Sequence, residues 1–259
     1  MMFKDLEYLS NKGKIEIDTV YNADCIEGMR YIPDNSIDCI ICDLPYGSTS
    51  CTWDTIIPFE QLWEQYNRIA KTNAAVVLFG NEPFASYLRL SNIKNYRYDI
   101  YWQKERITNI MQVKKRVGKD VETISVFYRE QCTYNPQMVE YNGAKRTNKV
   151  KDGKVGKLSD SKLHKVNEYE DKGVRYPTQI WKYKRDILTS NLHPTQKPLE
   201  LIRALVRTFS NPNDIILDNT IGSGTTAVAA LMENRHYIGF ENDRKYYNIA
   251  IERIKNANC

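Results

Sequence analysis

The sequence has little of what metal centres, disulfide frameworks and membrane spans require. Its 259 residues include only three histidines and six cysteines. His164 and His193 have no partners at metal-ligand spacing, so no metal is expected. The cysteines show no disulfide pattern. Cys39 and Cys42 form a C-x-x-C, but they lie within an apolar run, which favours core thiols over a redox or metal pair.

Long apolar runs are missing as well. None reaches the roughly 20 residues that a membrane-spanning helix needs. The opening stretch, MMFKDLEYLSNKGK, carries charges where a signal peptide would have its apolar segment. We therefore expect a reduced, cytoplasmic protein. The net charge of +5 permits a polyanionic partner without requiring one.

What the chain does contain is an alternation of short apolar runs and amphipathic stretches, which is typical of an α/β protein. Strands are expected at IDCIIC (37–42), AAVVLFG (74–80), RYDIYWQK (97–104), ETISVFYR (122–129), DIILDNT (214–220) and HYIGFEND (236–243). Helices are expected at FEQLWEQYNRIAK (59–71), KPLELIRALVRTFS (197–210), GSGTTAVAALMEN (222–234) and KYYNIAIERIKN (245–256).

Residues 131–190 differ from this pattern. Between Tyr141 and Arg175 there are ten Lys or Arg residues against five Asp or Glu residues, with almost no apolar periodicity. Such a composition cannot bury much surface, so a loop-rich, partly flexible insertion is expected. We therefore divide the chain into residues 14–130, 131–190 and 191–259.

The stretch ILDNTIGSGTTAVAA places two glycines between an expected strand and an expected helix. Gly222 and Gly224 would allow a tight turn and close approach of a ligand to the backbone. Glu241 ends the next strand, 17 residues after Gly224, where an acid can accept hydrogen bonds from a ribose. The stretch lacks the Gly-Lys pair of a phosphate loop and the third glycine of a dinucleotide fingerprint. S-adenosylmethionine, an adenosine ligand without a pyrophosphate, therefore fits better. The alternative is an ordinary strand-to-helix connection.

The stretch CDLPYGST (42–49) ends another expected strand with a carboxylate. Asp43 would stand at the ligand-binding edge of the sheet, and Leu44 is restricted to an extended conformation by Pro45. The Asp43 carboxylate and the Leu44 carbonyl could then accept both hydrogens of an adenine or cytosine amino group. The carboxylate would offset the charge that methylation creates. Tyr46 would stack on the base, worth about 1–3 kcal/mol, once the base has left the duplex. The alternative is a simple turn.

Together these motifs make the chain resemble the β class of DNA amino-methyltransferases. In that family a D/N/S-P-P-Y tetrapeptide precedes a target-recognition region and a glycine-rich cofactor motif. DLPY (43–46) resembles the tetrapeptide, and DNTIGSGTT (218–226) resembles the cofactor motif D-P-F-x-G-S-G-T-T. NADCIEGM (22–29) and HPTQKPLELI (193–202) are similar to two further cofactor segments. The resemblance implies a doubly wound, mostly parallel sheet of seven strands, in which the strands ending in the first two motifs are neighbours.

The resemblance also implies a role for each segment. Residues 14–130 would be the catalytic half, 131–190 the target-recognition insertion and 191–259 the cofactor-binding half. The implied catalytic residues are Asp43, Leu44, Pro45 and Tyr46. The implied S-adenosylmethionine-binding residues are Asp24, Cys25, Asp43, Lys197, Asp218, Ile221, Gly222, Ser223, Gly224, Thr225, Thr226, Glu241 and Asn242.

The chain departs from the family pattern at two places. Leu44 replaces the first proline of the tetrapeptide, a position that the family uses through its backbone carbonyl. Asn219, Thr220 and Ile221 replace a Pro-Phe-aromatic region, which leaves the packing of the adenosine open. An aspartate at position 43 is more typical of adenine methylases, so adenine N6 is the expected target and cytosine N4 the alternative. A non-catalytic DNA-binding protein with a methylase fold is the rival of a different class.

Double-stranded DNA is the implied partner, and a basic run after residues 97–104 would contact its phosphates. The alternative for this run is a solvated charged face. The expected DNA-binding residues are Lys104, Arg106, Lys114, Lys115, Arg116, Lys119, Lys184 and Arg185. Base-reading side chains are expected within 131–190, where Trp181, Tyr183, Lys184 and Arg185 are candidates. Local core packing could equally explain Trp181 and Tyr183. Family membership also implies a homodimer and allows a cognate restriction endonuclease.

Overall fold

The computed structural model describes residues 4–47, 54–141, 143, 172–186 and 196–257. The chain divides into two compact units, which we describe separately. The first comprises Met1–Asn135 and Gln179–Cys259, and the second comprises Pro136–Thr178. No helix within the described ranges is long and apolar enough to cross a membrane.

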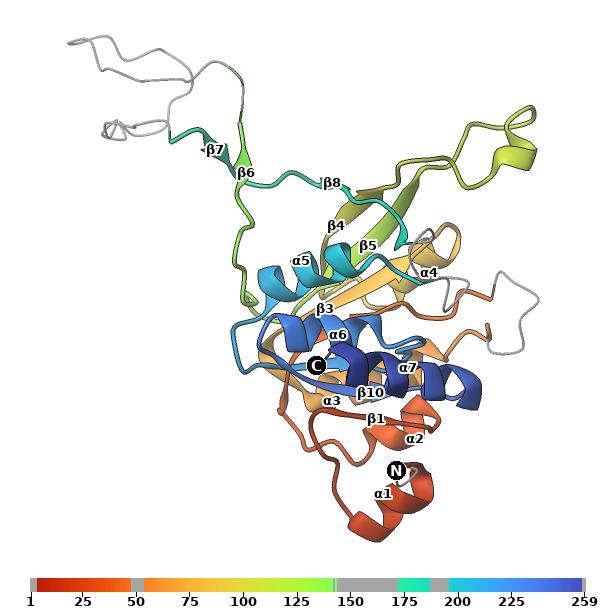
Figure 1. Ribbon diagram of the computed structural model, residues 1–259, viewed down its shortest axis with the longest axis vertical. Helices are drawn as coiled ribbons and strands as arrows, with labels where there is room; N and C mark the ends of the chain where they lie inside the picture. The colour runs from red at the N-terminus through yellow and green to blue at the C-terminus, as the bar shows by residue number, and fades with distance from the viewer. Residues whose placement is uncertain (1–3, 48–53, 142, 144–171, 187–195, 258–259) are drawn as a thin grey trace, which may run out of the picture. The chain divides into compact units, whose positions relative to one another are not determined.

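The first unit is built on one mostly parallel sheet of eight strands (Figure 1). In spatial order these are β1 (Thr19–Tyr21), β10 (His236–Phe240), β9 (Ile215–Asp218), β2 (Ile37–Cys42), β3 (Ala70–Gly80), β5 (Val121–Phe127), β4 (Tyr96–Gln103) and β8 (Ile180–Lys182). Only β5 runs antiparallel to its neighbours, β3 and β4. The doubly wound α/β fold is therefore confirmed.

The strand count differs from the seven that the resemblance implied. The eighth strand is β8, which pairs in parallel with β4 and sets Trp181 opposite Trp102. Its residues fall inside the expected insertion 131–190, yet they extend the main sheet. Trp181 is buried in the core of this unit, and Tyr183 packs against that core. For these two aromatic residues, the core alternative is the observed one.

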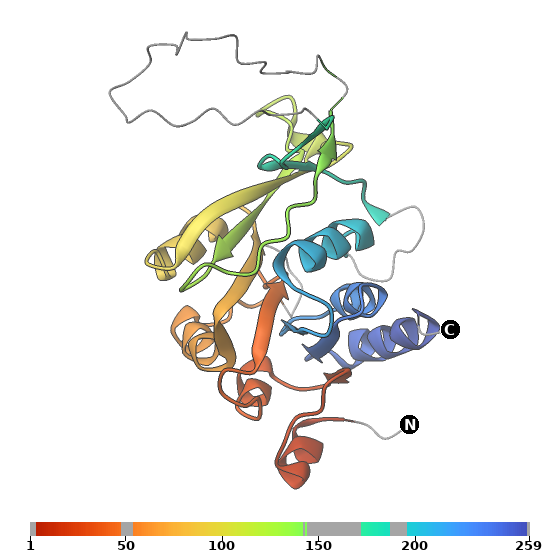
Figure 2. The same ribbon diagram turned by 90° about the vertical axis from the view of Figure 1, so that its left-hand side faces the viewer.

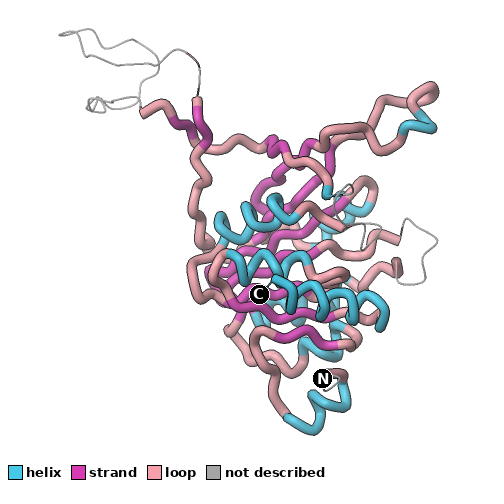
Figure 3. The backbone as a smooth tube through the Cα atoms, viewed as in Figure 1, coloured by secondary structure: helices cyan, strands magenta, loops and turns pink. Residues whose placement is uncertain are grey.

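Helices cover both faces of the sheet (Figure 2). One face carries α5 (Leu199–Phe209), α6 (Thr225–Met232) and α7 (Arg244–Ala257). The other carries α2 (Cys25–Met29), α3 (Phe59–Ile69) and α4 (Phe84–Ser91), with α1 (Leu6–Lys12) packed beside them. A short 3-10 helix, Ile110–Gln112, lies in the connection between β4 and β5 (Figure 3).

The apolar pattern of β2 explains how the two faces are filled. Cys39 and Ile41 join the core under α5 and α6, whereas Ile40 and Cys42 join the core under α3. Successive strand residues point to opposite faces, so a continuous apolar run serves both layers. Cys39 and Cys42 are buried free cysteines on opposite faces, which confirms that they are core thiols and not a redox pair.

The strand order places a topological switch point between β9 and β2. The chain leaves β9 through α6 toward β10 and leaves β2 through α3 toward β3, in opposite directions along the sheet. The two strands pair in parallel, with Ile40 opposite Leu217, so the expected neighbourhood of the two motif-bearing strands is confirmed. Open α/β sheets bind ligands at the carboxyl ends of such strands.

In the second unit, β6 (Val139–Glu140) pairs antiparallel with β7 (Val174–Arg175). The Arg175 guanidinium lies 4.1 Å from the ring centre of Tyr141. Most of the lysine-rich stretch, including His164, lies outside the described residues, and so does His193. The expectations for those segments are therefore not addressed by the structure.

Candidate active site

A pocket of about 660 Å³ lies at the carboxyl ends of the central strands. It brings together residues from all four sequence motifs, although these are spread over some 200 positions of the chain. All four residues of the tetrapeptide line it. So do all of the expected cofactor residues except Gly224, namely Asp24, Cys25, Asp43, Lys197, Asp218, Ile221, Gly222, Ser223, Thr225, Thr226, Glu241 and Asn242. The candidate catalytic and cofactor residues thus share one cavity.

The tetrapeptide begins directly after β2. Leu44 is buried, and the Tyr46 ring is supported by Phe84, with the ring centres 5.0 Å apart. The Asp43 backbone carbonyl accepts a hydrogen bond of 3.0 Å from the Thr220 hydroxyl. Because Thr220 belongs to the glycine-rich stretch, this bond ties the tetrapeptide directly to the expected cofactor loop.

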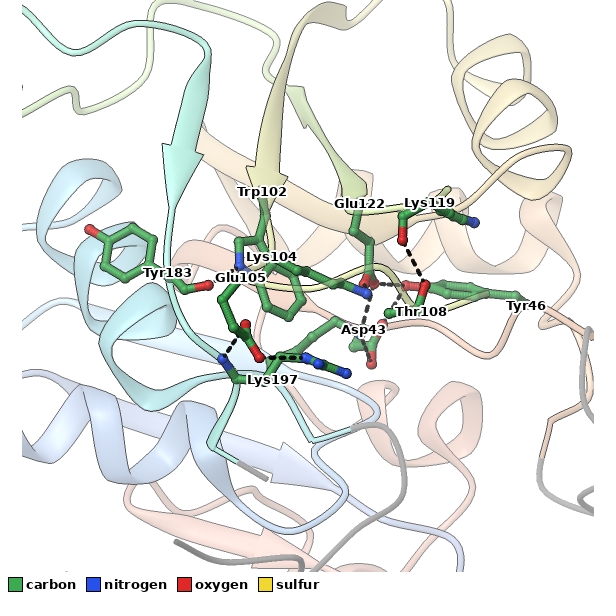
Figure 4. A network of polar contacts seen from close by, with 11 residues as sticks. Asp43, Tyr46, Trp102, Lys104, Glu105, Thr108, Lys119, Glu122, Tyr183 and Lys197 are labelled. Atoms are coloured by element: carbon green, nitrogen blue, oxygen red, sulfur yellow. Dashed lines mark hydrogen bonds and ion pairs between the residues drawn. The ribbon is translucent and has the colours of Figure 1, made fainter. Parts of the chain in front are cut away.

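A network of two carboxylates, two ammonium groups and a phenol fills this part of the pocket (Figure 4). Lys197 Nζ lies 2.5 Å from Asp43 Oδ2 and 3.0 Å from Glu122 Oε1. Lys104 Nζ lies 2.8 Å from Glu122 Oε2. The Tyr46 hydroxyl is 2.6 Å from Asp43 Oδ1 and 3.1 Å from Glu122 Oε1.

The electrostatics of this network follow from its burial and its charge balance. Burial raises the pKa of Asp43, an effect that Lys197 opposes and Glu122 reinforces. Burial would also raise the pKa of Glu122, but the Lys197 and Lys104 ammonium groups outweigh it and lower that pKa to about 2. Burial and the two carboxylates raise the pKa of Tyr46, so its hydroxyl remains a donor. The pKa of Lys197 is raised because its two carboxylate partners outweigh its burial.

The glycine-rich stretch turns tightly between β9 and α6. Gly222 and Gly224 have φ values of 54° and 83°, in the left-handed region that side chains disfavour. A Cβ at Gly224 would lie 3.1 Å from Ala250 Cβ, so this glycine lets the turn pack against α7. Arg253, also on α7, donates a 2.8 Å hydrogen bond to the Thr225 hydroxyl and holds the start of α6.

Two acids frame the same part of the pocket. The Glu241 carboxylate accepts hydrogen bonds from the backbone N–H groups of Gly222 and Asp243, at 2.9 and 2.8 Å. Burial raises the pKa of Glu241 to about 7. Asp24 is exposed and caps α2 by accepting from the Ile26 and Glu27 N–H groups. Each carboxylate therefore keeps lone pairs for a ligand hydroxyl or amino group.

The structure also accounts for the departure at positions 219–221. The Asn219 side-chain oxygen accepts a 2.5 Å hydrogen bond from the Tyr66 hydroxyl and lies 2.8 Å from Cys42 Sγ. Ile221 is buried, and its Cδ1 fills the space that a side chain at Gly239 would occupy. A buried polar contact and an aliphatic side chain thus fill the place of the family's Pro-Phe-aromatic region.

Sequence reasoning did not identify Glu122 or Tyr66. Glu122 lies within VETISVF, the run that forms β5, and it is 4% exposed. A charged residue inside a strand that is otherwise uncharged was the available signal, because such a residue needs a partner when buried. Tyr66 lies on the buried face of α3 and had no comparable signal.

The basic run forms an arm of residues 104–120 between β4 and β5, closed at its base by a 2.7 Å bond from the Lys104 N–H to the Asp120 carbonyl. Arg106, Lys114, Lys115 and Arg116 are exposed on this arm, and Lys119 is half-buried. Lys104 is different from these residues. Its side chain is 11% exposed, pairs with Glu122 and lines the pocket. Lys184 is exposed, whereas Arg185 pairs with Glu105 at 3.1 Å.

Comparison with known proteins places this geometry in a family. The chain is 26% identical over 254 residues to the DNA adenine methyltransferase YhdJ of Escherichia coli (strain K12), covering 92% of this chain and 83% of that protein. It is 25% identical to the type II methyltransferase M.HindIII of Haemophilus influenzae, and the match covers 94% of this chain and 97% of that protein. A similar fold occurs in the M1.HpyAVI–SAM complex, with a TM-score of 0.61, 24% identity, and 91% of this chain and 98% of that chain covered. The cytosine-N4-specific PvuII DNA methyltransferase also has a similar fold, with a TM-score of 0.63, 16% identity, and 94% of this chain and 92% of that chain covered. The family model described as DNA methylase matches residues 37–252, and the chain therefore belongs to the DNA methylase family.

Proposed function

We propose that this DNA methylase transfers a methyl group from S-adenosylmethionine to the N6 amino group of an adenine flipped out of double-stranded DNA. The observation that carries the proposal is the junction between Asp43 and the glycine-rich stretch. Asp43 shares one cavity with Gly222 and Glu241, and its carbonyl is hydrogen-bonded to Thr220. An acceptor for an amino group and a cradle for an adenosine are thus directly joined.

The residues present fit S-adenosylmethionine. When bound, this cofactor supplies an electrophilic methyl group on a sulfonium. Glu241 would accept the ribose hydroxyls, and Asp24 would accept a hydrogen from the adenine amino group of the cofactor. The positive φ of Gly222, which lines the pocket, would allow the backbone to approach the ligand closely. No phosphate-binding charge lies in this turn, which agrees with a ligand that has no phosphate.

Asp43 is proposed to activate the target base. An amino group on an aromatic ring is a poor nucleophile because its lone pair is delocalised. Accepting its hydrogens on the Asp43 carboxylate and the Leu44 carbonyl localises that lone pair on nitrogen. The carboxylate would then offset the positive charge that develops as the new N–C bond forms and the methyl–sulfonium bond breaks. The products would be S-adenosylhomocysteine and the methylated amine, whose extra proton would pass to solvent. Tyr46, which lines the pocket and rests on Phe84, would support the face of the base.

Adenine is favoured over cytosine as the target. The aspartate at position 43 is typical of adenine enzymes within the resemblance, and the relative YhdJ is named a DNA adenine methyltransferase. The fold does not separate the two targets, because the PvuII enzyme with the same fold is named cytosine-N4-specific. A cytosine N4-methyltransferase is therefore the second candidate.

The arm of residues 104–120 is proposed to hold the DNA backbone, with the target site read elsewhere. Its exposed cations Arg106, Lys114, Lys115 and Arg116 suit phosphates, as does Lys119 near the end of the arm. Lys184, which is also exposed, follows the edge strand β8. A homodimer, a cytoplasmic location and a cognate restriction endonuclease complete the proposal. The similar proteins include both type II enzymes and one named an orphan methyltransferase.

The test is product analysis. DNA from a methylase-deficient host is incubated with the protein and methyl-labelled S-adenosylmethionine, digested to nucleosides and separated by chromatography. Label in N6-methyladenine supports the proposal, and label in N4-methylcytosine establishes the second candidate instead. Label in neither base, from folded protein that binds the cofactor, contradicts both.

A further inference from the structure

Each oxygen of the Asp43 carboxylate already has one donor in the structure. Oδ1 accepts from the Tyr46 hydroxyl at 2.6 Å, and Oδ2 lies 2.5 Å from Lys197 Nζ (Figure 4). Each oxygen keeps one further lone pair, so an incoming amino group would share an oxygen with one of these donors or replace that donor. A buried donor that loses its acceptor costs free energy unless a second acceptor is within reach.

Glu122 supplies that second acceptor for both donors. Its Oε1 is 3.1 Å from the Tyr46 hydroxyl and 3.0 Å from Lys197 Nζ. The Tyr46 hydroxyl has one hydrogen for two carboxylates, so it can donate to Asp43 or turn to Glu122 without leaving its place. Lys104, 2.8 Å from Oε2, holds Glu122 from the other side.

We propose that Glu122 is a positioning residue for methyl transfer, which receives the Tyr46 hydroxyl and Lys197 when the target amino group engages Asp43. This inference rests on the proposed function and deepens it. Glu122, on β5, would free the Asp43 carboxylate for the base by accepting the hydrogen bonds of its present donors. It holds for an adenine or a cytosine amino group, since either presents the same two hydrogens.

The charges around Asp43 make the inference testable. The groups that act on Asp43 directly are Lys197, Glu122, Tyr46 and Asp218. Lys104 and Lys119 act on Glu122. Two carboxylates balance two ammonium groups at the centre. Without the Glu122 charge, Lys197 has Asp43 as its remaining carboxylate partner in the network and holds it more tightly against the incoming base.

The first variant is Glu122→Gln, which keeps the shape and removes the charge. We expect the Kd for S-adenosylmethionine to remain within about twofold, while kcat/KM for DNA falls by roughly 100-fold, the scale of a small misplacement of a reacting group. Loss of a neighbouring negative charge lowers the pKa of Asp43, so the acidic limb of the kcat–pH profile should move down by about 1 pH unit. A residue that only supported the fold would leave this limb unmoved.

Two further variants separate charge from shape. Lys104→Gln combined with Glu122→Gln restores the charge balance around Asp43, so the acidic limb should return toward its wild-type position. Glu122→Asp keeps the charge on a shorter side chain, so the acidic limb should stay in place. Its kcat/KM should fall less than that of Glu122→Gln. Because the readout is the position of the limb, a partial loss of folded protein does not obscure it.

Glu16→Gln is the matched control. Glu16 accepts from Lys4 Nζ at 2.6 Å and from the Tyr8 hydroxyl at 3.0 Å, a similar Lys–Glu–Tyr arrangement whose residues do not line the pocket. Its kinetics and pH profile should match those of the wild type. If the wild type is active but Glu122→Gln has an unshifted acidic limb and an unchanged kcat/KM, the inference is overturned. The proposed function would stand in that case. A wild type that methylates no DNA overturns the proposed function and the inference with it.

Discussion

Lys197 Nζ lies 2.5 Å from the Asp43 carboxylate, although the two residues are 154 positions apart in the chain. Asp43 follows β2, and Lys197 precedes α5, which covers the sheet face beside α6. The segments expected to bind base and cofactor therefore meet through this ion pair as well as through the Thr220–Asp43 hydrogen bond. The reactive site is completed only when both halves of the sheet are assembled.

The first prediction concerns Asp43. Asp43→Ala removes the carboxylate that accepts the amino hydrogens and offsets the developing charge, so kcat should fall by roughly 1,000-fold or more. Binding of S-adenosylmethionine should remain within about fivefold, because Glu241 and the glycine turn are untouched. Calorimetry with the cofactor and single-turnover methylation of DNA measure the two quantities. Turnover like that of the wild type would refute the role of Asp43.

The second prediction concerns pH. Burial raises the pKa of Glu241 to about 7. Hydrogen bonds from ribose hydroxyls favour its ionised form, so cofactor affinity should rise as pH rises through 7 and fall as the carboxyl is protonated below it. If only the ionised form binds, affinity should rise roughly fourfold between pH 6.5 and 8. This window lies above the pKa of Asp218, which burial raises to about 6.

Isothermal titration of S-adenosylmethionine across that range measures the slope. Glu241→Gln is the control, because it has no charge to gain and should flatten the dependence as well as weaken binding. A variant that keeps the wild-type slope would show that the ionisation belongs to another group or to the ligand itself.

Much of the sheet and of the cofactor turn could be predicted because their signals are local. The apolar run 37–42 forms β2, and the glycines of GSGTT stand at the predicted turn into α6. The short strand β8 could not be predicted in the same way. Its three residues lie in a polar stretch, and its pairing with β4 depends on Trp181 reaching the core.

Side-chain direction explains why Lys104 lies apart from the exposed cations of the arm. Its positive charge placed it among the phosphate contacts, yet it lies over the Trp102 ring at 4.8 Å and pairs with Glu122. Trp102 is buried, and residues two apart on a strand share a face, so the alternation of β4 already indicated an inward lysine. Charge alone does not state a direction. Glu122 was not identified because its partners, Tyr46, Lys104 and Lys197, come from three distant segments of the chain.

The third prediction concerns DNA binding through Lys115, which is exposed on the arm. Lys115→Ala should weaken binding to all DNA sequences by a similar factor and reduce the slope of log K against log salt by about 1, since one phosphate contact is lost. Fluorescence anisotropy at several salt concentrations measures both. Lys94→Ala is the control, because this exposed lysine precedes the opposite end of β4. A change in which sequence is methylated would contradict a phosphate role.

The last prediction concerns the stability of the buried pair. Lys197→Met leaves the Asp43 and Glu122 carboxylates with one ammonium partner, Lys104, in a buried network. Breaking a buried ion pair on one side costs about 3–5 kcal/mol of unfolding free energy. Removing the positive charge also raises the pKa of Asp43 further, so the folded state holds a proton that the unfolded chain releases. Stability of the variant should therefore fall as pH rises from the unfolded pKa of about 4 toward the raised folded value.

Urea unfolding at pH 5.5 and 8 measures this loss, with Lys71→Met as the matched control. Lys71 also lies 2.6 Å from an aspartate, Asp38, but its side chain is 42% exposed. Water screens that pair, so its removal should cost less than about 1 kcal/mol and show little pH dependence. Equal losses in the two variants would mean that the Lys197 pair is as well solvated as a surface one. A large loss confined to Lys197→Met, and greater at pH 8, would establish that Asp43 depends on Lys197 to remain ionised inside the pocket.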